Sequence, residues 1–294
     1  MISASKVETN KLLMQCLDFD KALFDESTLT EAEKKYFQSF INGFNRQIEL
    51  FADWLESDEA KELFGENLEY NDIAFESIIP ELDKIIEDTN LTAEEIIDSI
   101  YDLGLENGYD EIRRTKYYND ATKYGLKILQ EYNFDLIQNL HNDVIEHIRT
   151  QIFIGIAAGE GMPEVMKRIL SAHEESLTGK TLTARQRAMM IARTETARAM
   201  TQGRLQSYAN YGVEEVKILT AEDSNVCPIC LEAAYIFNGD PHIDNVSGER
   251  IHKITEKLVP FHPNCRCSVM AYLRHVALPG KPLDDAVQIN LVPT

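Results

Sequence analysis

The stretch TARQRAMMIARTETARAMTQGRLQSYANYG, residues 183–212, predicts one long helix in the second half of the chain. Thr183 is a residue type that favours the helix N-cap, and Gly212 is the type that most often follows a last helical turn. The helix is also basic, because it contains a single acidic residue, Glu195, and five arginines: Arg185, Arg187, Arg193, Arg198 and Arg204.

These five arginines have two interpretations. On a helix surface they are candidates for contact with DNA or with an acidic protein partner, since arginines bind phosphates and carboxylates. Alternatively, they pair with acidic groups of the same chain, either in its N-terminal region or at the nearby Glu214 and Glu215. The sequence leaves both interpretations open.

The residues after this helix predict a small α+β module. Residues 213–219, VEEVKIL, are rich in β-branched residues and predict a strand. We expect a second strand at residues 269–273, paired with the first. Residues 234–261 contain several glycines and prolines and are expected to be mostly loop. The proline-containing residues after 279 are expected to form an extended tail.

Four of the five cysteines lie in two short motifs of this module, whereas Cys16 lies alone. The motifs are Cys227-Pro-Ile-Cys230 and His262-Pro-Asn-Cys265-Arg-Cys267. A C-x₂-C turn directs two thiolates at one point, and a second Cys/His cluster about 30 residues away can complete a tetrahedral Zn²⁺ site. This distribution favours a metal site over a secreted disulfide scaffold.

We expect Cys227, Cys230, His262 and Cys265 to be the ligands, because H-x₂-C repeats the spacing of the first motif. Cys267 is an alternate ligand, since spacing does not decide between it and Cys265. Four protein ligands leave no open position for water, so the predicted Zn²⁺ is structural. Its binding would supply folding free energy to a loop-rich segment.

Two other chemistries compete with this site. A Cys227–Cys230 redox pair would need a βαβ context and would leave the second motif without a role. A zinc-stabilised nuclease would use polar residues around the cysteines, but the spacing of its usual His pairs is absent. The candidates for it are Asp223, His242, Asp244 and His252. The triplet Arg193-Thr194-Glu195 has a partial likeness to an ADP-ribosyltransferase site, but it lies within a predicted helix without the necessary strand.

Residues 8–150 are predicted to be helical almost throughout. Residues 31–55 carry apolar side chains at three- and four-residue spacing, which places them on one helix face. Thr92 and Glu95 predict the capping box of a further helix start.

A long helix is expected over residues 124–153, with a break near Asn133. The Gly-rich stretch 155–161 predicts a hinge, because it lacks the Lys-Ser/Thr pair of a phosphate-binding loop. Pro163 suits the first turn of the helix that follows.

Acidic residues are concentrated in the N-terminal part of the chain. The net charge is −20, and residues 1–110 contain 8 basic and 27 acidic residues. Such an acidic region does not bind DNA phosphates; it keeps the chain solvated or contacts a basic protein. No apolar run reaches the roughly 18–20 residues that span a bilayer, and the first residues do not form a secretory signal. We therefore expect no membrane partner.

Together these patterns predict a mainly α protein with a small α+β zinc-binding C-terminal module and a helical N-terminal domain or arm. The expected domains are an acidic helical domain for partner docking at residues 1–154, the module with the zinc knuckle at 155–278, and an extended tail at 279–294.

Residues 150–275 resemble the Mu F-like head-morphogenesis family of tailed phages, whose members are minor head proteins. The matching features are, in chain order, Ile191-Ala-Arg-Thr-Glu195 in a long helix, Tyr208 and Gly212 at its end, Thr220-Ala-Glu-Asp223 after a strand, and the two cysteine motifs. Each feature alone is common, and their order makes the set specific.

The resemblance implies a virion component, assembled in the host cytoplasm and located in the head interior or at the portal vertex. It implies the portal protein, the major capsid or scaffold protein and, non-specifically, packaged double-stranded DNA as partners. The implied function is non-enzymatic, in head morphogenesis and DNA packaging. The alternative is a zinc-stabilised nuclease or other enzyme acting during packaging or DNA entry.

Overall fold

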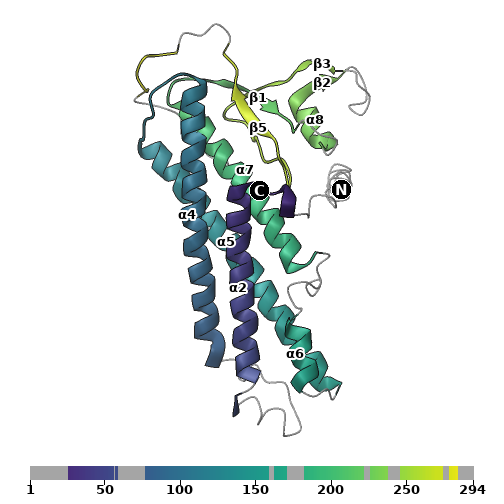
Figure 1. Ribbon diagram of the computed structural model, residues 1–294. Helices are drawn as coiled ribbons and strands as arrows, with labels where there is room; N and C mark the ends of the chain where they lie inside the picture. The colour runs from purple at the N-terminus through teal and green to yellow at the C-terminus, as the bar shows by residue number, and fades with distance from the viewer. Residues whose placement is uncertain are drawn as a thin grey trace, which may run out of the picture. The chain divides into compact units, whose positions relative to one another are not determined.

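The computed structural model describes residues 26–55, 57–58, 77–158, 162–170, 182–221, 226–237, 246–273 and 278–283. Over these residues the chain is mainly helical with a small strand region near its C-terminus (Figure 1), as predicted. The helices are η2 (Glu26–Thr28), α2 (Glu31–Leu55), α4 (Ile79–Glu111), α5 (Asp120–Ala157), α6 (Met162–Leu170), α7 (Ala184–Ala209) and α8 (Pro228–Ala234). The strands are β1 (Glu215–Leu219), β2 (Tyr235–Phe237), β3 (Val246–Glu249), β4 (Ile251–Lys253) and β5 (Ser268–Ala271).

The chain divides into two compact units whose segments alternate along the sequence. Unit 1 has the limits Met1–Glu33, Ile96–Tyr132 and Met190–Thr294, and unit 2 has the limits Lys34–Glu95 and Asn133–Met189. Helices α2, α4, α5 and α7 each contribute residues to both units. The domain limits expected at residues 154 and 278 stay predictions.

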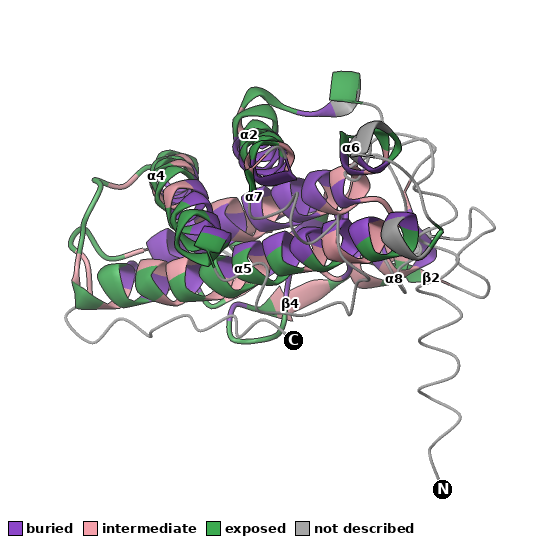
Figure 2. Ribbon diagram, turned by 90° about the horizontal axis from the view of Figure 1, so that it is seen from below, coloured by how far each residue is buried: buried purple, intermediate pink, exposed green. Residues whose placement is uncertain are grey.

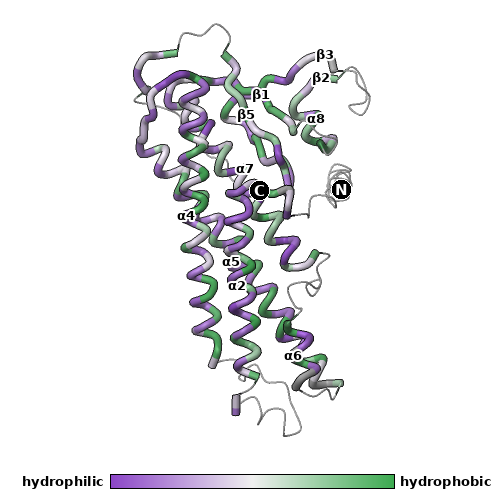
Figure 3. Tube along the Cα trace, in the orientation of Figure 1, coloured by the Kyte–Doolittle hydropathy of each residue, from purple (hydrophilic) through white to green (hydrophobic). Residues whose placement is uncertain are grey.

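The apolar faces of α2, α4 and α5 supply the core of unit 2. Phe37, Phe40 and Phe44 of α2 are buried, as their spacing predicted. The ring of His141 on α5 stacks on Phe40, with ring centroids 6.3 Å apart. Figure 3 shows the alternation of hydrophobic and hydrophilic residues along these helices that places one face in the core.

Capping boxes fix where two helices begin. The Thr183 hydroxyl accepts from the backbone N–H of Gln186 at 3.1 Å, and the Gln186 side chain accepts from the Thr183 N–H at 3.0 Å. Thr30 and Glu33 make the same reciprocal pair ahead of α2. The predicted cap and stop of the helix over residues 183–212 are therefore confirmed, since Gly212 follows α7 with a left-handed φ of 73°.

Two local predictions for the N-terminal helices are wrong. Thr92 lies inside α4, where its hydroxyl donates to the carbonyl of Asp88 at 3.0 Å instead of capping a new helix. Buried Ala93 and Ile97 continue the apolar face of α4 past this point, so packing overrides the local signal.

The predicted break near Asn133 is also absent. Asn133 is buried within the continuous helix α5, and its side-chain oxygen accepts a hydrogen bond from the hydroxyl of Tyr36. This partner satisfies the polar side chain without interrupting the helix. Helix α5 continues to Ala157, into the predicted hinge; residues 159–161 of that hinge lie outside the described residues.

In unit 1, α7 is mostly buried (Figure 2) and packs directly on the backbone of α4. A Cβ added at Gly104 of α4 would lie 2.3 Å from the carbonyl oxygen of Met200 on α7. A Cβ at Gly108, one turn further, would lie 1.9 Å from the hydroxyl of Ser207. Glycines at these positions therefore permit a helix contact that any side chain would block.

The strands form a three-stranded antiparallel sheet in the order β4-β1-β5 and a separate β2-β3 pair. The predicted pairing of the first and last strands is confirmed, with Ile218 opposite Val269. Residues 234–261 were expected to be loop, but they contain β2, β3 and β4. These strands have only three or four residues, too few for apolar alternation to reveal them.

Two helices hold the outer edge of β5. The Val269 carbonyl accepts from the Arg204 guanidinium on α7 at 3.1 Å, and the Ala271 N–H donates to Glu111 at the end of α4 at 2.7 Å. Tyr208 also donates to Glu111, at 2.8 Å. The strand that directly follows Cys267 is thereby anchored to the helical part of unit 1.

None of the helices within the described parts of the chain combines the length and apolar character needed to cross a membrane.

Candidate metal centre

The first cysteine motif forms the start of helix α8. Cys227 is the N-cap residue, with φ −77° and ψ 160°, and Pro228 occupies the first helical position. The Cys227 carbonyl accepts from the N–H of Leu231 at 3.1 Å, which closes the first turn. Cys230 is thus held one turn from Cys227, so both thiols lie on the same side of the helix start.

The second motif begins with a tight turn. The N–H of Cys265 donates to the carbonyl of His262 at 3.2 Å, and Asn264 has a φ of 64°. Pro263 and Asn264 occupy the second and third positions of this turn, where a type II turn favours proline and a residue that tolerates positive φ. The turn brings the His262 ring and the Cys265 thiol to the same region.

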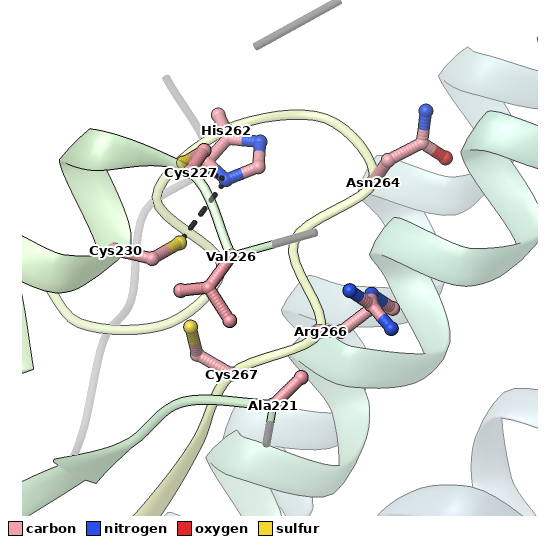
Figure 4. Close-up of a pocket in the computed structure, with 8 residues that line it drawn as sticks. All are labelled: Ala221, Val226, Cys227, Cys230, His262, Asn264, Arg266 and Cys267. Atoms are coloured by element: carbon pink, nitrogen blue, oxygen red, sulfur yellow. Dashed lines mark hydrogen bonds between the residues drawn. The ribbon is translucent and has the colours of Figure 1, made fainter. Parts of the chain in front are cut away.

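The two motifs meet in one buried cluster (Figure 4). The Nε2 atom of His262 lies 3.1 Å from the Sγ atom of Cys227 and 3.1 Å from that of Cys230. The Sγ atoms of Cys230 and Cys265 are 3.8 Å apart. Donor atoms within 4.8 Å of one another form two groups that share Cys230: one with Cys227 and His262, the other with Cys265 and Cys267.

Three of the distances between donor atoms are close to those around a tetrahedral ion, whereas Cys265 lies outside the group that Cys227 and His262 form with Cys230. With metal–sulfur bonds of about 2.3 Å and metal–nitrogen bonds of about 2.0 Å, tetrahedral angles place two sulfurs about 3.8 Å apart and a sulfur and a nitrogen about 3.5 Å apart. The Cys230–Cys265 separation equals the first value, and the two contacts of His262 fall slightly short of the second. Cys227, Cys230, His262 and Cys267 also line a small pocket beside the cluster.

The imidazole of His262 is oriented for ligation. Its Nδ1 atom lies 2.6 Å from the carbonyl oxygen of Pro263, so Nδ1–H donates to this oxygen. The lone pair then belongs to Nε2, which faces Cys227 and Cys230. A backbone carbonyl that fixes the tautomer of a ligand histidine is the usual outer partner in metal sites.

The close contacts in the cluster shift the pKa values of its thiols and imidazole. Hydrogen bonding to Cys230 lowers the pKa of the Cys227 thiol to about 4, with a further contribution from His262. The same contact, with that to Cys265, raises the pKa of Cys230. Burial opposes a charge on His262, but the contact with Cys227 and the nearby thiolates raise its pKa to about 9. The cluster therefore retains protons that a bound divalent cation would displace.

The structure thus brings Cys227, Cys230 and His262 together and places Cys265 against Cys230. Cys267 lies in the same group as Cys265, and both are buried. The cluster could hold a metal ion. Zn²⁺ as its identity, and the choice between Cys265 and Cys267, stay predictions.

The five arginines of α7 all have contacts within the chain, some of them with acidic side chains as the second interpretation expected, and their contact with DNA or a protein partner stays a prediction. Arg187 donates to Asp143, Arg198 pairs with Glu195 at 2.8 Å, and Arg204 holds the Val269 carbonyl. The side chain of Arg193 is 1% exposed, and its Nε atom lies 4.0 Å from Glu33. The guanidinium of Arg185 lies 5.3 Å from the ring centroid of Phe37.

Of the four candidate residues for the nuclease alternative, the structure describes His252. His252 lies on β4, with Nε2 2.7 Å from the carbonyl oxygen of Ala233 and Nδ1 3.1 Å from Glu256. The contact with Ala233 ties β4 to the end of α8. Asp223, His242 and Asp244 lie outside the described residues, as does Cys16.

Residues 146–270 match the model of a family described as Phage Mu protein F like protein, which confirms the resemblance carried by the ordered motifs. The matched residues include all of α7, the sheet strands β1 and β4, and both cysteine motifs. No curated protein and no solved structure was found to match the chain.

Proposed function

We propose that this chain is a minor head protein of a tailed phage or prophage that acts in head morphogenesis and DNA packaging. The observation that carries the proposal is the match of residues 146–270 to the Phage Mu protein F like family. The buried Cys/His cluster lies within these residues, and it brings together two cysteine motifs that are about 30 residues apart in the sequence.

The metal in this proposal is a structural Zn²⁺. A set of three thiolates and one imidazole is a common donor set for Zn²⁺ and leaves no position for a reacting water. The ion would join the start of α8 to the turn at His262–Cys265, segments of unit 1 that are far apart in sequence. In this proposal the protein is non-enzymatic and acts in assembly.

The proposed partners are the portal protein and the major capsid or scaffold protein, with packaged double-stranded DNA as a non-specific contact. The proposed location is the head interior or the portal vertex. Because the arginines of α7 have partners within the chain, DNA or protein contacts need not involve them. The acidic N-terminal third favours a basic protein surface over DNA as its own partner.

Co-expression with the portal protein of the same gene cluster, followed by sedimentation of the portal rings, tests the proposal. A fixed ratio of this chain in the ring fractions is expected. Normal rings with this chain at the top of the gradient would contradict portal association. The sedimentation should be repeated with capsid shells and with linear DNA, so that each proposed partner has its own result.

The nuclease alternative has a separate test. Purified chain loaded with Zn²⁺, Mg²⁺ or Mn²⁺ is incubated with plasmid DNA, and we expect no cleavage. Cleavage that is lost in His252→Ala, Asp223→Asn or His242→Ala would replace the assembly proposal with an enzymatic one.

A further inference from the structure

The turn that carries His262 and Cys265 makes a backbone contact with helix α7, through Thr194. The N–H of Asn264 donates to the hydroxyl oxygen of Thr194 at 2.9 Å, across 70 residues of sequence. Both residues are buried, with Asn264 2% exposed. No water can therefore substitute for this partner without opening the packed structure.

The turn itself explains why Asn264 needs an outside acceptor. In a type II turn, the hydrogen bond that closes the turn uses the N–H of the fourth residue, here Cys265. The N–H of the third residue, Asn264, points away from that bond and has no acceptor within the turn. A buried N–H without a partner costs about 1–3 kcal/mol, so the acceptor on α7 stabilises this turn conformation.

Helix α7 orients the Thr194 hydroxyl for this task. The hydroxyl donates its own hydrogen to the carbonyl of Met190 at 2.7 Å, one turn earlier in the helix. Its oxygen is then left to accept from Asn264, because one hydroxyl has one donor and two acceptor positions. Both neighbours of Thr194 are buried and paired: Arg193 near Glu33, and Glu195 with Arg198.

We infer that Thr194 is a positioning residue for the metal centre, which holds the His262–Cys265 turn in the conformation that presents both ligands. The inference rests on the proposed metal role of the cluster. Thr194 touches no ligand atom and acts through the backbone of Asn264. The Asn264 side chain is directed away from the cysteines (Figure 4), so the backbone makes the connection.

The test compares metal affinity in the full-length chain. Thr194→Val keeps the shape of the side chain and removes the acceptor, and we expect it to weaken Zn²⁺ or Co²⁺ binding about 10- to 100-fold in a chelator competition, as loss of an outer partner does. Thr194→Ser keeps the hydroxyl and should bind as the wild type does. The Co²⁺ spectrum of Thr194→Val should retain its thiolate bands, because the ligand set is unchanged.

Thr196→Val is the matched control. Thr196 lies on the same helix and is buried, and its hydroxyl has no hydrogen-bond partner among the described residues. Its removal should leave metal affinity unchanged. Equal affinities for Thr194→Val, Thr196→Val and the wild type would overturn the inference while leaving the metal centre intact. A wild-type chain that takes up no metal would overturn the metal proposal and this inference together.

A second variant covers the case in which Thr194→Val does not fold. Asn264→Gly keeps both the backbone N–H and the positive φ, and removes only the side chain. We expect wild-type metal affinity and slow exchange of the residue 264 amide. Loss of metal binding in Asn264→Gly would show that the side chain is the necessary group and would overturn the role given to Thr194.

Discussion

A Cβ atom on Gly203 would lie 3.0 Å from the carbonyl carbon of Gly104 and 2.3 Å from the carbonyl oxygen of Tyr101. Helices α7 and α4 therefore meet backbone to backbone in unit 1. The contact brings α7 close enough for Arg204 and Tyr208 to reach Glu111, and so for β5 to be held by both helices.

Gly203→Ala should destabilise the protein. In an exposed helix the substitution would gain up to about 1 kcal/mol, but here the added methyl group meets backbone atoms that cannot move aside, and overpacking costs about 1–3 kcal/mol. Urea unfolding measures the difference. Gly280→Ala is the control, since nothing lies within 4 Å of a Cβ at that position. Equal midpoints for the two variants would contradict the close helix contact.

The cysteines should differ in their importance for metal binding. Cys230 belongs to both groups of donor atoms, so Cys230→Ser should abolish binding, and Cys227→Ser should release Zn²⁺ and unfold the C-terminal module. Of Cys265→Ser and Cys267→Ser, one should lose the ion and the other retain it. Bound metal per chain is measured after dialysis against a weak chelator. Full occupancy in Cys230→Ser would disprove the proposed ligand set.

Charge reversal at Arg187 should destabilise unit 2 without any partner being present. Arg187 on α7 donates to Asp143 on α5, and their side chains are 19% and 31% exposed. Arg187→Glu would place two carboxylates together and lower the free energy of unfolding by roughly 1–3 kcal/mol. The double variant Asp143→Arg/Arg187→Glu should recover part of this loss.

The exposed pair of Arg46 and Asp88 is the matched control for this reversal, because its side chains are 45% and 42% exposed. Arg46→Glu should change the free energy of unfolding by less than about 1 kcal/mol. If Arg187→Glu were equally harmless but reduced DNA or portal binding, the arginines of α7 would be a partner surface instead.

His141 should make unit 2 sensitive to acid. Burial lowers its pKa from 6.5 to about 3, and neither ring nitrogen has a hydrogen-bond partner within the described residues. Between these two pH values the unfolded chain binds a proton that the folded chain excludes. The stability due to neutral His141 is therefore complete above pH 6.5 and is lost as the pH falls towards 3, by about 1.4 kcal/mol per pH unit.

His141→Leu should remove this dependence. The variant and the wild type should have similar stability at pH 8, and at pH 5 the wild type should have lost about 2 kcal/mol more. The comparison is made by urea unfolding at each pH, and loss of metal in acid affects both proteins alike. Parallel pH profiles would mean that His141 is protonated or reached by water in the folded state.

The sequence predicted those elements that depend on residues close together in the chain, such as helix caps and the first cysteine motif. The helix from Ala184 was predictable because Thr183 is a favoured N-cap residue, and the structure adds Gln186 as its capping partner. The cysteine cluster was predictable because C-x₂-C spacing already directs two thiols together. The helix start predicted at Thr92 is wrong because the apolar face of α4 continues on both sides of this residue, and its packing keeps the helix continuous.

Other features depend on contacts between distant residues. The Thr194 acceptor for Asn264 lies 70 residues away, and no periodicity or composition marks it. The arginines of α7 were visible as charges, but their partners Asp143, Glu33 and Phe37 come from segments far apart in the chain. Strands as short as β4 were missed because three residues carry no measurable alternation.

The contacts that hold β5 extend beyond the segment that matches the family. The matched segment begins at residue 146, within α5, yet Glu111, which binds the Ala271 N–H and the Tyr208 hydroxyl, lies before it at the end of α4. Gly104 and Gly108, against which α7 packs, precede it as well. A fragment cut at the start of the match would expose the buried face of α7 and leave the edge of β5 open to other chains. A recognisable family segment is therefore not an independent folding module in this chain, because residues 146–270 depend on the upstream helices for their packing.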